Sequence, residues 1–342
     1  MSFKHISVVI LNWNGKAFLE QFLPSVVANS GDAKIVVADN GSTDNSIEFV
    51  QTNYPDIELI INKENGGFSK GYNYALNFVD NQLYVLLNSD IEVTPNWLSP
   101  LSEMMHDENI AGCQPKVLSF HNKTLFEHSG SSGGFIDRNY FPFCRGRFFD
   151  HIEEDNGQYN DNLEIFWATG ACLMIRSDVF HKIGGFDEDF FAHMEEIDLC
   201  WRIKKMNMKF MVCPSSSVYH IGGGTLPYNS PRKVYLNFRN SLIMITKNHE
   251  GALCSKLFQR LILDGIAAIT FIINGEFKNF ISVLSAHMWY YSHIRLTLKK
   301  RKAVKAQATK FNSTGFYTGS IIVAYFIKKI KAYSKLDQRL FK

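Results

Sequence analysis

Short β-branched runs alternate with helical patterns over the first ninety residues, and this alternation limits the possible folds more than any other feature. Four apolar runs have the length of strands, and they lie at 6–11, 34–38, 57–61 and 83–87. Apolar residues between these runs recur at helical spacing. Such alternation is typical of βαβ units. We therefore expect an α/β fold with a mostly parallel central sheet flanked by helices. A later run at 165–176 reads as one strand, interrupted at Thr169 and Gly170.

The chain of 342 residues changes character near residue 245, which we take as a domain boundary. The segment 1–245 is long enough for one large core, and we divide it into halves of about 1–93 and 94–245. The remainder, 246–342, mixes apolar helical faces with Lys and Arg. Thirteen basic residues and a single acidic one lie from Arg295 onward. This extension is predicted to be helical, amphipathic and basic.

Such a basic segment suits an anionic surface, and we expect peripheral contact with an anionic membrane. Nucleic acid is not expected as a partner, because the segment lacks interleaved aromatic platforms and any recognisable motif. The first residues do not have the pattern of a signal peptide, and no run of eighteen apolar residues occurs. We expect a cytoplasmic protein, at the inner face of the cytoplasmic membrane. Six cysteines without CxxC spacing predict buried free thiols rather than a zinc site.

Polar residues follow the first two predicted strands, where ligands of open α/β sheets bind. Asn12 follows the first strand and Asp39 follows the second. Neither place has a GxGxxG sequence, which argues against a dinucleotide-binding oxidoreductase. The Asp39 carboxylate can accept a hydrogen bond from the ring NH of uracil or thymine. A tight turn in which Ser42 or Asp44 caps the next helix explains the same residues equally well.

A third group of polar residues, Asn88 to Glu92, follows the buried run at 83–87. Asp90 and Glu92 are candidate ligands of Mg²⁺ or Mn²⁺ beside a nucleoside diphosphate. A structural turn is the alternative. His220 follows another strand-like run and precedes three glycines, so that its imidazole can complete a metal shell. Most single histidines are not metal ligands, and this alternative also stays open.

An acidic and aromatic segment at 186–202 leads into a helical pattern. A carboxylate held in a partly apolar pocket at the edge of this helix would serve as a general base, and the catalytic candidates are Glu195, Glu196 and Asp198. Helix geometry offers alternatives for each. The offset of four residues also pairs Asp198 with Arg202, and acids favour a helix N-terminus without any catalytic role.

Taken together, these segments resemble the inverting family 2 glycosyltransferases of the GT-A fold, in particular rhamnosyltransferase-like and galactofuranosyltransferase-like members. The resemblance covers about residues 5–245. It is carried by the order and spacing of VVILNWNG at 8–15, VVADNGSTDNS at 36–46, NGGFSKGYN at 65–73, LLNSDIEV at 86–93, TGACLMIR at 169–176, GGFDEDFFAHMEEIDLCWR at 184–202 and VYHIGGGT at 218–225.

The resemblance implies roles for individual residues. The residues expected to hold the nucleotide are Asn12, Asp39, Asn65, Gly67, Lys70 and Asn88, the last standing where many members have Asp. Asp90 would be the principal metal ligand, and His220 would contact metal or diphosphate. Glu196 would be the general base in a direct displacement that inverts the anomeric carbon.

The function implied is transfer of rhamnose or another hexose from a UDP- or dTDP-sugar to a hydroxyl of a glycan or lipid-linked acceptor, in cell-surface polysaccharide synthesis. Two alternatives belong to other classes. A sugar nucleotidyltransferase would carry a glycine-rich, basic phosphate loop after the first strand, where this chain has a single glycine between Asn12 and Lys16. A non-catalytic sugar-binding relative would bind the donor without turnover.

Overall fold

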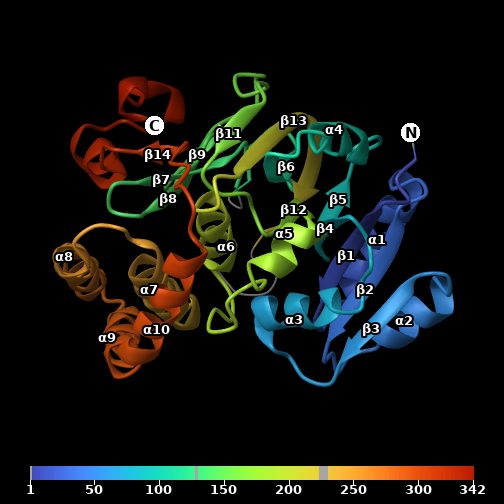
Figure 1. The fold of residues 1–342 in the computed structure, drawn as a ribbon, viewed down its shortest axis with the longest axis horizontal. Helices are drawn as coiled ribbons and strands as arrows, with labels where there is room; N and C mark the ends of the chain where they lie inside the picture. The colour runs from blue at the N-terminus through green and yellow to red at the C-terminus, as the bar shows by residue number, and fades with distance from the viewer. Residues whose placement is uncertain (1, 128–129, 223–229) are drawn as a thin grey trace.

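The computed structural model describes residues 2–127, 130–222 and 230–342, and a nine-stranded sheet forms the centre of this part of the chain (Figure 1). Its strands are β1 (Ile6–Asn12), β2 (Lys34–Asn40), β3 (Glu58–Asn62), β4 (Leu83–Asn88), β5 (Ile91–Val93), β6 (Ile110–Ser119), β11 (Leu163–Ile165), β12 (Cys172–Arg176) and β13 (Lys209–His220). The strand order is β11-β13-β6-β12-β4-β1-β2-β3, and β5 pairs with β13. The four strands β4, β1, β2 and β3 are parallel, as predicted.

Beyond β4 the sheet is mixed, which differs from the expectation of a mostly parallel sheet. Strand β12 runs antiparallel to both β4 and β6, whereas β13 is parallel to β6. The reversal follows from the connections, because these strands are joined by loops and short helices rather than by a regular series of βαβ crossovers. The run at 165–176 is divided between β11 and β12, which pair with different neighbours.

Helices cover both faces of the sheet and give the molecule two apolar cores. Alternate residues of β1 point to opposite faces, so that Val8 and Ile10 lie in one core and Val9 in the other. One face is covered by α1 (Lys16–Asn29), α2 (Ser46–Asn53) and α4 (Leu98–Met104). The other is covered by α3 (Gly67–Leu76), α5 (Ser177–Lys182), α6 (Glu195–Lys204) and α7 (Pro231–Asn248).

A five-stranded second sheet lies beside the central one in the described residues (Figure 1). It consists of β7 (Gly134–Asp137), β8 (Pro142–Cys144), β9 (Arg147–Phe148), β10 (His151–Ile152) and β14 (Phe316–Tyr317). The last strand comes from the C-terminal part of the chain and pairs with β7. The segment after residue 245 is therefore joined to the rest of the fold by a sheet contact.

The C-terminal part contains α8 (Leu253–Ile273), α9 (Phe277–Ser292) and α10 (Ile294–Gln307), which pack around α7. The boundary expected at residue 245 falls inside α7, since this helix continues to Asn248. Among the described residues, no helix combines the length and the apolar character needed to cross a bilayer. All six cysteines are free; five are buried as predicted, and Cys254 is exposed.

Candidate functional site

The carboxyl ends of β1 and β2 bring Asn12 and Asp39 side by side as register partners. Asn12 is fully buried, and its Nδ2 donates to Oδ2 of Asp39 over 3.0 Å. The backbone NH of Ser42 donates to Oδ1 of the same carboxylate over 2.9 Å. The predicted turn at Asp39 is thus formed. A carboxylate has further lone pairs, and Oδ1 of Asn12 is buried without a partner in the described structure, so polar capacity remains at this edge.

The next residue of β2, Asn40, organises the loop that precedes α3. Its Nδ2 donates to Oδ1 of Asn65 and to the carbonyl of Gly67 over 3.1 and 3.0 Å. Gly67 has a φ of +77°, and a Cβ there would lie 2.3 Å from the carbonyl oxygen of Phe191. Only glycine fits this conformation and this close contact. The loop is thereby held against the segment that leads into α6.

Lys70 and Asn88 are the remaining residues predicted for nucleotide binding. Lys70 is exposed on the first turn of α3, directly after the Gly67 loop. Asn88 ends β4, and its backbone NH donates to the carbonyl of Ala171 over 2.9 Å. All six residues predicted for nucleotide binding therefore belong to strands β1, β2 and β4 or to the loop and helix between β3 and β4.

Asp90 and His220, which are 130 positions apart in the sequence, are in contact. Strand β5 pairs with the end of β13, and Nε2 of His220 lies 3.1 Å from Oδ1 of Asp90. Nδ1 of the same ring lies 3.0 Å from Oε2 of Glu127. Burial lowers the pKa of His220, but the two carboxylates outweigh burial and raise this pKa to about 10. An imidazolium therefore lies between two carboxylates. Residues 223–225 of the motif that begins before His220 lie outside the described residues.

Glu92 does not join this group. Its Oε1 lies 2.7 Å from Nζ of Lys123, and the carboxylate is 30% exposed. In the described ranges no three His, Cys, Asp or Glu side chains are arranged to hold a metal ion. The expected ligand set of Asp90, His220 and Glu92 is thus not assembled as a unit, because the Glu92 side chain pairs with a surface lysine instead.

The donor set around Asp90 fits a divalent cation that a diphosphate also binds. A position that stabilises an imidazolium between two carboxylates favours positive charge. Hard cations such as Mg²⁺ and Mn²⁺ prefer carboxylate and phosphate oxygens and commonly take few protein ligands beside a nucleotide. His220 becomes a ligand only after it loses its proton. Asp90 is therefore the residue best suited to hold such an ion.

Two glutamates begin α6, and Glu195 is buried whereas Glu196 is partly buried. Glu195 is 5% exposed, and the Oε2 atoms of both Glu195 and Glu196 make no hydrogen bond within the described structure. Burial raises the pKa of Glu196 to about 7. Burial and the charge of Glu196 raise the pKa of Glu195 well above its usual value. Unpaired buried carboxylates are costly, and raised pKa values of this kind are typical of functional sites.

Glu196 lies next to the edge where the strands end. A Cβ added to Gly170 would lie 3.6 Å from the Cβ of Glu196 and 3.0 Å from the ring of Phe68. The following residue, Ala171, accepts the hydrogen bond from Asn88 at the end of β4. Glu196 is thus a neighbour of the nucleotide-side loop and of the strand that leads to Asp90.

A strained turn positions these glutamates. His193 and Met194, directly before α6, both have positive φ values of 69° and 72°. Non-glycine residues in this region store strain that the surrounding structure must support. Asn240 of α7 is fully buried, and its Nδ2 donates to the carbonyls of Ala192 and His193 over 2.8 and 2.7 Å. Arg239 also donates to the carbonyl of Asp189 over 2.7 Å. Helix α7 therefore holds the turn in place.

Asp198 has a structural environment, which corrects its inclusion among the catalytic candidates. This side chain is fully buried, and Oδ2 lies 2.8 Å from both Nε of Arg202 and Nζ of Lys247. Its Oδ1 accepts from Nδ2 of Asn248 over 2.8 Å. Both oxygens are thus occupied by cations and an amide, and the predicted ion pair with Arg202 is confirmed.

Three residues of the site escaped the sequence reasoning as site residues. Asn40 is the last residue of β2, and its place at a strand end is the sequence signal that could have found it. Glu127 lies in a segment without periodic pattern, and Asn240 lies inside a helix where a buried amide has no sequence signature. Their partners become visible only in three dimensions.

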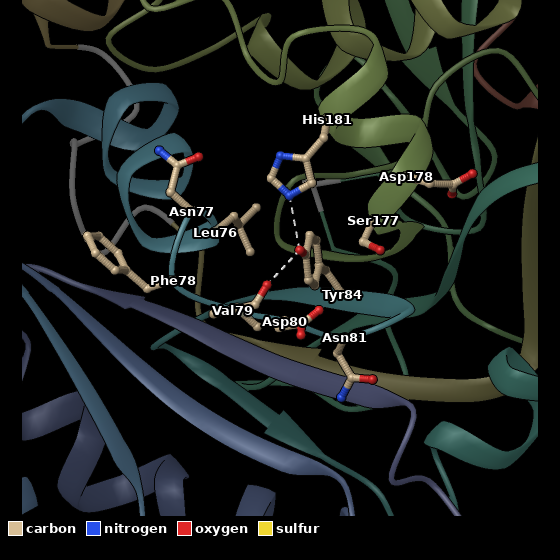
Figure 2. A pocket seen from close by; sticks show the side chains of 10 residues that line it. All are labelled: Leu76, Asn77, Phe78, Val79, Asp80, Asn81, Tyr84, Ser177, Asp178 and His181. Atoms are coloured by element: carbon tan, nitrogen blue, oxygen red, sulfur yellow. Dashed lines mark hydrogen bonds between the residues drawn. The ribbon is translucent and has the colours of Figure 1, made fainter.

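A separate pocket of about 350 Å³ lies at the amino end of β4, and Figure 2 shows the side chains that line it. It is lined by the start of β4, the segment after α3 and helix α5, with Tyr84 donating to the carbonyl of Val79 over 2.8 Å and lying 3.0 Å from Nε2 of His181. Because Tyr84 lies near the amino end of β4 and Asn88 at its carboxyl end, this pocket is not part of the candidate site.

Comparisons with known proteins show the family of this chain. A model of the family described as glycosyl transferase family 2 matches residues 7–184. The hexosyltransferase Agl10 of low-salt glycan biosynthesis in Haloferax volcanii is 26% identical over 244 residues, covering 70% of this chain and 74% of that protein. The N-acetylglucosaminyl-diphospho-decaprenol L-rhamnosyltransferase of Mycobacterium tuberculosis is 23% identical, covering 72% and 85%. The dTDP-rhamnosyl transferase RfbF of Shigella flexneri is 22% identical, covering 74% and 83%.

Solved structures share the fold. The mannosyltransferase PcManGT of Pyrobaculum calidifontis, in complex with GDP-Man and Mn²⁺, has a TM-score of 0.52 at 13% identity and covers 89% of this chain and 85% of its own. GalNAc-T7 with UDP, GalNAc and Mn²⁺ has a TM-score of 0.55 at 17% identity, covering 71% of this chain and 47% of its own. The predicted GT-A type fold is confirmed. Since the family model spans more than half of the sequence, the chain belongs to the family 2 glycosyltransferases and is rhamnosyltransferase-like.

Proposed function

We propose that this protein is an inverting, metal-dependent hexosyltransferase with Glu196 as its general base. The observation that carries the proposal is the partly buried Glu196, whose Oε2 is buried without a hydrogen-bond partner in the described structure and which lies beside the ends of the parallel strands. A base with a pKa of about 7 is well matched to proton abstraction near neutral pH. Asp198 of the same helix is bound by Arg202 and Lys247, whereas Oε2 of Glu196 has no partner in the described structure and can accept a proton.

The donor is a UDP- or dTDP-sugar bound at the carboxyl edge of β1, β2 and β4. The carboxylate of Asp39 accepts a hydrogen bond from the ring NH of the pyrimidine, and Asn12 fixes the orientation of this carboxylate. Asn65 and Gly67 shape the loop near the base and ribose, and the exposed ammonium of Lys70 lies at the start of the following helix. Asn88 completes the set at the end of β4. The printed names of relatives that use rhamnose support a rhamnosyl or other hexosyl group.

Asp90 holds a divalent cation, Mg²⁺ or Mn²⁺, together with the diphosphate of the donor. When bound, such an ion offsets the phosphate charge and stabilises the departing nucleoside diphosphate. His220 is positioned by Glu127 on one ring nitrogen, so that its other nitrogen points to Asp90. Glu92 pairs with Lys123 and is not proposed as a ligand of the ion.

Glu196 accepts the proton of the acceptor hydroxyl as the oxygen attacks the anomeric carbon. The bond to the nucleoside diphosphate breaks in line, which inverts the anomeric configuration and leaves the proton on the carboxyl group. The pKa of Glu195 is raised further, so this side chain remains protonated and neutral. The base therefore has no second negative charge beside it. The strained turn at His193 and Met194 fixes both side chains for this step.

The acceptor is a hydroxyl of a glycan or of a lipid-linked saccharide in cell-surface polysaccharide synthesis. Support comes from relatives whose names include glycan biosynthesis and a decaprenol-linked acceptor. The acceptor half of the chain, about residues 94–245, includes β7 to β10 of the second sheet and most of α7, which lie on the side of α6 away from the nucleotide strands (Figure 1).

Release of nucleoside diphosphate from a panel of UDP-, dTDP- and GDP-sugars tests this proposal, with Mn²⁺, Mg²⁺ or EDTA and with saccharide acceptors. We expect one donor to be turned over in a metal-dependent way, and Asp90→Ala to lower that rate by at least about tenfold, since a carboxylate ligand is lost. Asp56→Ala removes an exposed carboxylate in a turn and serves as the matched control.

Donor binding without turnover under all these conditions would contradict the proposal and favour a sugar-binding protein. Formation of a nucleotide sugar from nucleoside triphosphate and sugar phosphate would favour a nucleotidyltransferase instead. If Asp90→Ala released nucleoside diphosphate at the wild-type rate in a metal-dependent way, Asp90 would not be a ligand of the ion.

A further inference from the structure

Helix α8 has the reverse of the usual arrangement of apolar and charged side chains. The charged residues Arg260 and Asp264 are only 5% and 1% exposed, and they pair with each other over 2.6 Å. His287 of α9 lies 3.1 Å from the same aspartate. The solvent-facing side is instead apolar over four turns. A helix in water buries its apolar face and exposes its charges, so this arrangement indicates that another medium contacts α8.

The apolar surface continues across the turn into α9, with which α8 forms a hairpin at one end of the molecule (Figure 1). Twelve large apolar or aromatic side chains on these two helices are 39% to 77% exposed, namely Phe258, Leu261, Ile262, Ile266, Ile269, Ile272, Ile273, Phe277, Ile281, Leu284, Met288 and Tyr291. Exposed apolar patches of this extent are rare on proteins that contact only water. We call this surface the hairpin face.

The charge around the hairpin face is mainly positive, although Glu276 is exposed in the turn between α8 and α9. No acidic residue occurs between Glu276 and Asp337. The following helix, α10, begins at Ile294 next to the end of α9 and carries Arg295, Lys299 and Lys302, all three exposed. An apolar face flanked by cations matches the boundary between acyl chains and anionic headgroups.

We propose that the hairpin face is a membrane-docking surface that lies in the interfacial layer of an anionic phospholipid bilayer. The helices lie on the membrane and do not cross it, which agrees with their buried charged residues. A second copy of the chain is the other possible occupant. It is less well matched, because two such faces would bring together two rows of cations with only Glu276 of each copy as an exposed acid in the turn between α8 and α9. The inference concerns binding and stands independently of the reaction proposed above.

Vesicle flotation of the full chain tests the proposal without donor or acceptor. Vesicles of phosphatidylcholine alone are compared with vesicles in which roughly one third of the lipid is phosphatidylglycerol. We expect binding to the anionic vesicles that weakens as salt is raised. The double variant Ile273→Glu with Phe277→Glu places charge at the tip of the hairpin, and it should weaken binding by at least about tenfold.

Phe78→Glu is the matched control, because Phe78 is 57% exposed and Phe277 is 63% exposed, and the chemical change is the same. It lies after α3, outside the hairpin face, and should bind vesicles as the wild type does. Lys299→Gln and Lys302→Gln should each weaken binding to anionic vesicles by about fivefold. Circular dichroism and thermal unfolding confirm that each variant is folded.

Two results would overturn the proposal. The first is that the wild-type chain remains in the bottom fraction, without vesicles of either kind, at low salt. The second is a stable dimer, measured by light scattering, that the double glutamate variant converts into a monomer while vesicle binding is absent throughout. That result would assign the hairpin face to a second copy of the chain.

Discussion

Acidic side chains of one short segment, residues 187–198, have two contrasting environments. Asp187 and Asp198 are paired with cations from the C-terminal helices, whereas Glu195 and Glu196 each keep a buried oxygen without a partner in the described structure. Burial raises the pKa of Asp187, yet Lys247 and Lys300 beside it hold that pKa below its usual range. Burial without cations raises the pKa of Glu196 to about 7.

The difference teaches that the cations, not the depth of burial, decide what a carboxylate does here. Lys247 reaches both Asp187 and Asp198, and Lys300 reaches Asp187 and Asp189. These contacts connect α7 and α10 to the loop before α6. The paired acids hold the loop, and the unpaired ones are left to react. Substitutions of the two kinds of carboxylate should therefore have different effects, on stability for the paired acids and on the rate for the unpaired ones.

Glu196→Gln should give the largest effect on the reaction. The amide keeps the shape of the side chain but cannot accept the proton, so kcat should fall by about 10²- to 10⁴-fold. The KM for the donor should change little, because the proposed role of Glu196 is toward the acceptor hydroxyl and Gln keeps the shape of the side chain. Steady-state rates of nucleoside diphosphate release with donor and acceptor provide the measurement.

Glu188→Gln makes the same chemical change at an exposed position of the same segment, and it should leave kcat within about twofold of wild type. If the Glu196 variant retained full activity while folded, the unpaired carboxylate would not be the base, and Glu195→Gln would then be the informative substitution.

Asp198→Ala should have the largest effect on stability. It leaves Arg202 and Lys247 buried without their shared carboxylate, and breaking a buried pair in this way costs about 3–5 kcal/mol in the free energy of unfolding. Urea denaturation measures the loss, with the exposed Asp56→Ala expected to change stability by no more than about 0.5 kcal/mol. A stable Asp198→Ala protein with a large loss of kcat would instead return Asp198 to the catalytic candidates.

The rate should depend on pH through the glutamate pair. The base acts when deprotonated, so kcat/KM should rise about tenfold per pH unit up to about pH 7 and then level off. Because the pKa in the folded protein is raised, the native state binds more protons than the unfolded state between about pH 4.5 and 7. Stability should therefore fall as pH rises through this window.

Glu196→Gln should make this fall in stability shallower. Glu195 titrates together with Glu196, so the measured value belongs to the pair. A rate that is flat from pH 5 to 8 would show that no carboxylate with a raised pKa takes part in the reaction.

The nucleotide half was predictable because each of its elements is specified locally. The apolar runs at 6–11 and 83–87 became β1 and β4, and parallel pairing then brings Asn12, Asp39 and Asn88 to one edge. Alternation of strand and helix patterns is enough to imply this arrangement. The family resemblance added the roles of these residues, not their proximity.

The other half was less predictable because its contacts join distant parts of the chain. The pairing of Asp90 with His220 depends on β5 meeting the far end of β13, and Glu127 comes from an irregular segment. The division of 165–176 into two strands depends on pairing partners that local pattern does not encode. Likewise, Asn240 supports the turn before α6 from within α7, where the sequence shows only an amphipathic helix.

Glu92→Gln should have the smallest effect, and it tests the same division at the metal side of the site. Glu92 and Lys123 form a partly exposed pair, and such pairs contribute at most about 1 kcal/mol to stability. If Glu92 is only this surface partner, the variant should keep metal-dependent release within about twofold of wild type, while Asp90→Ala loses it. Titrating Mn²⁺ against the rate distinguishes the cases, since a ligand role would shift the half-saturating concentration upward by about tenfold or more. Such a shift would mean that Glu92 leaves its lysine when the donor binds, and that even a cation-paired acid of this site can change its role.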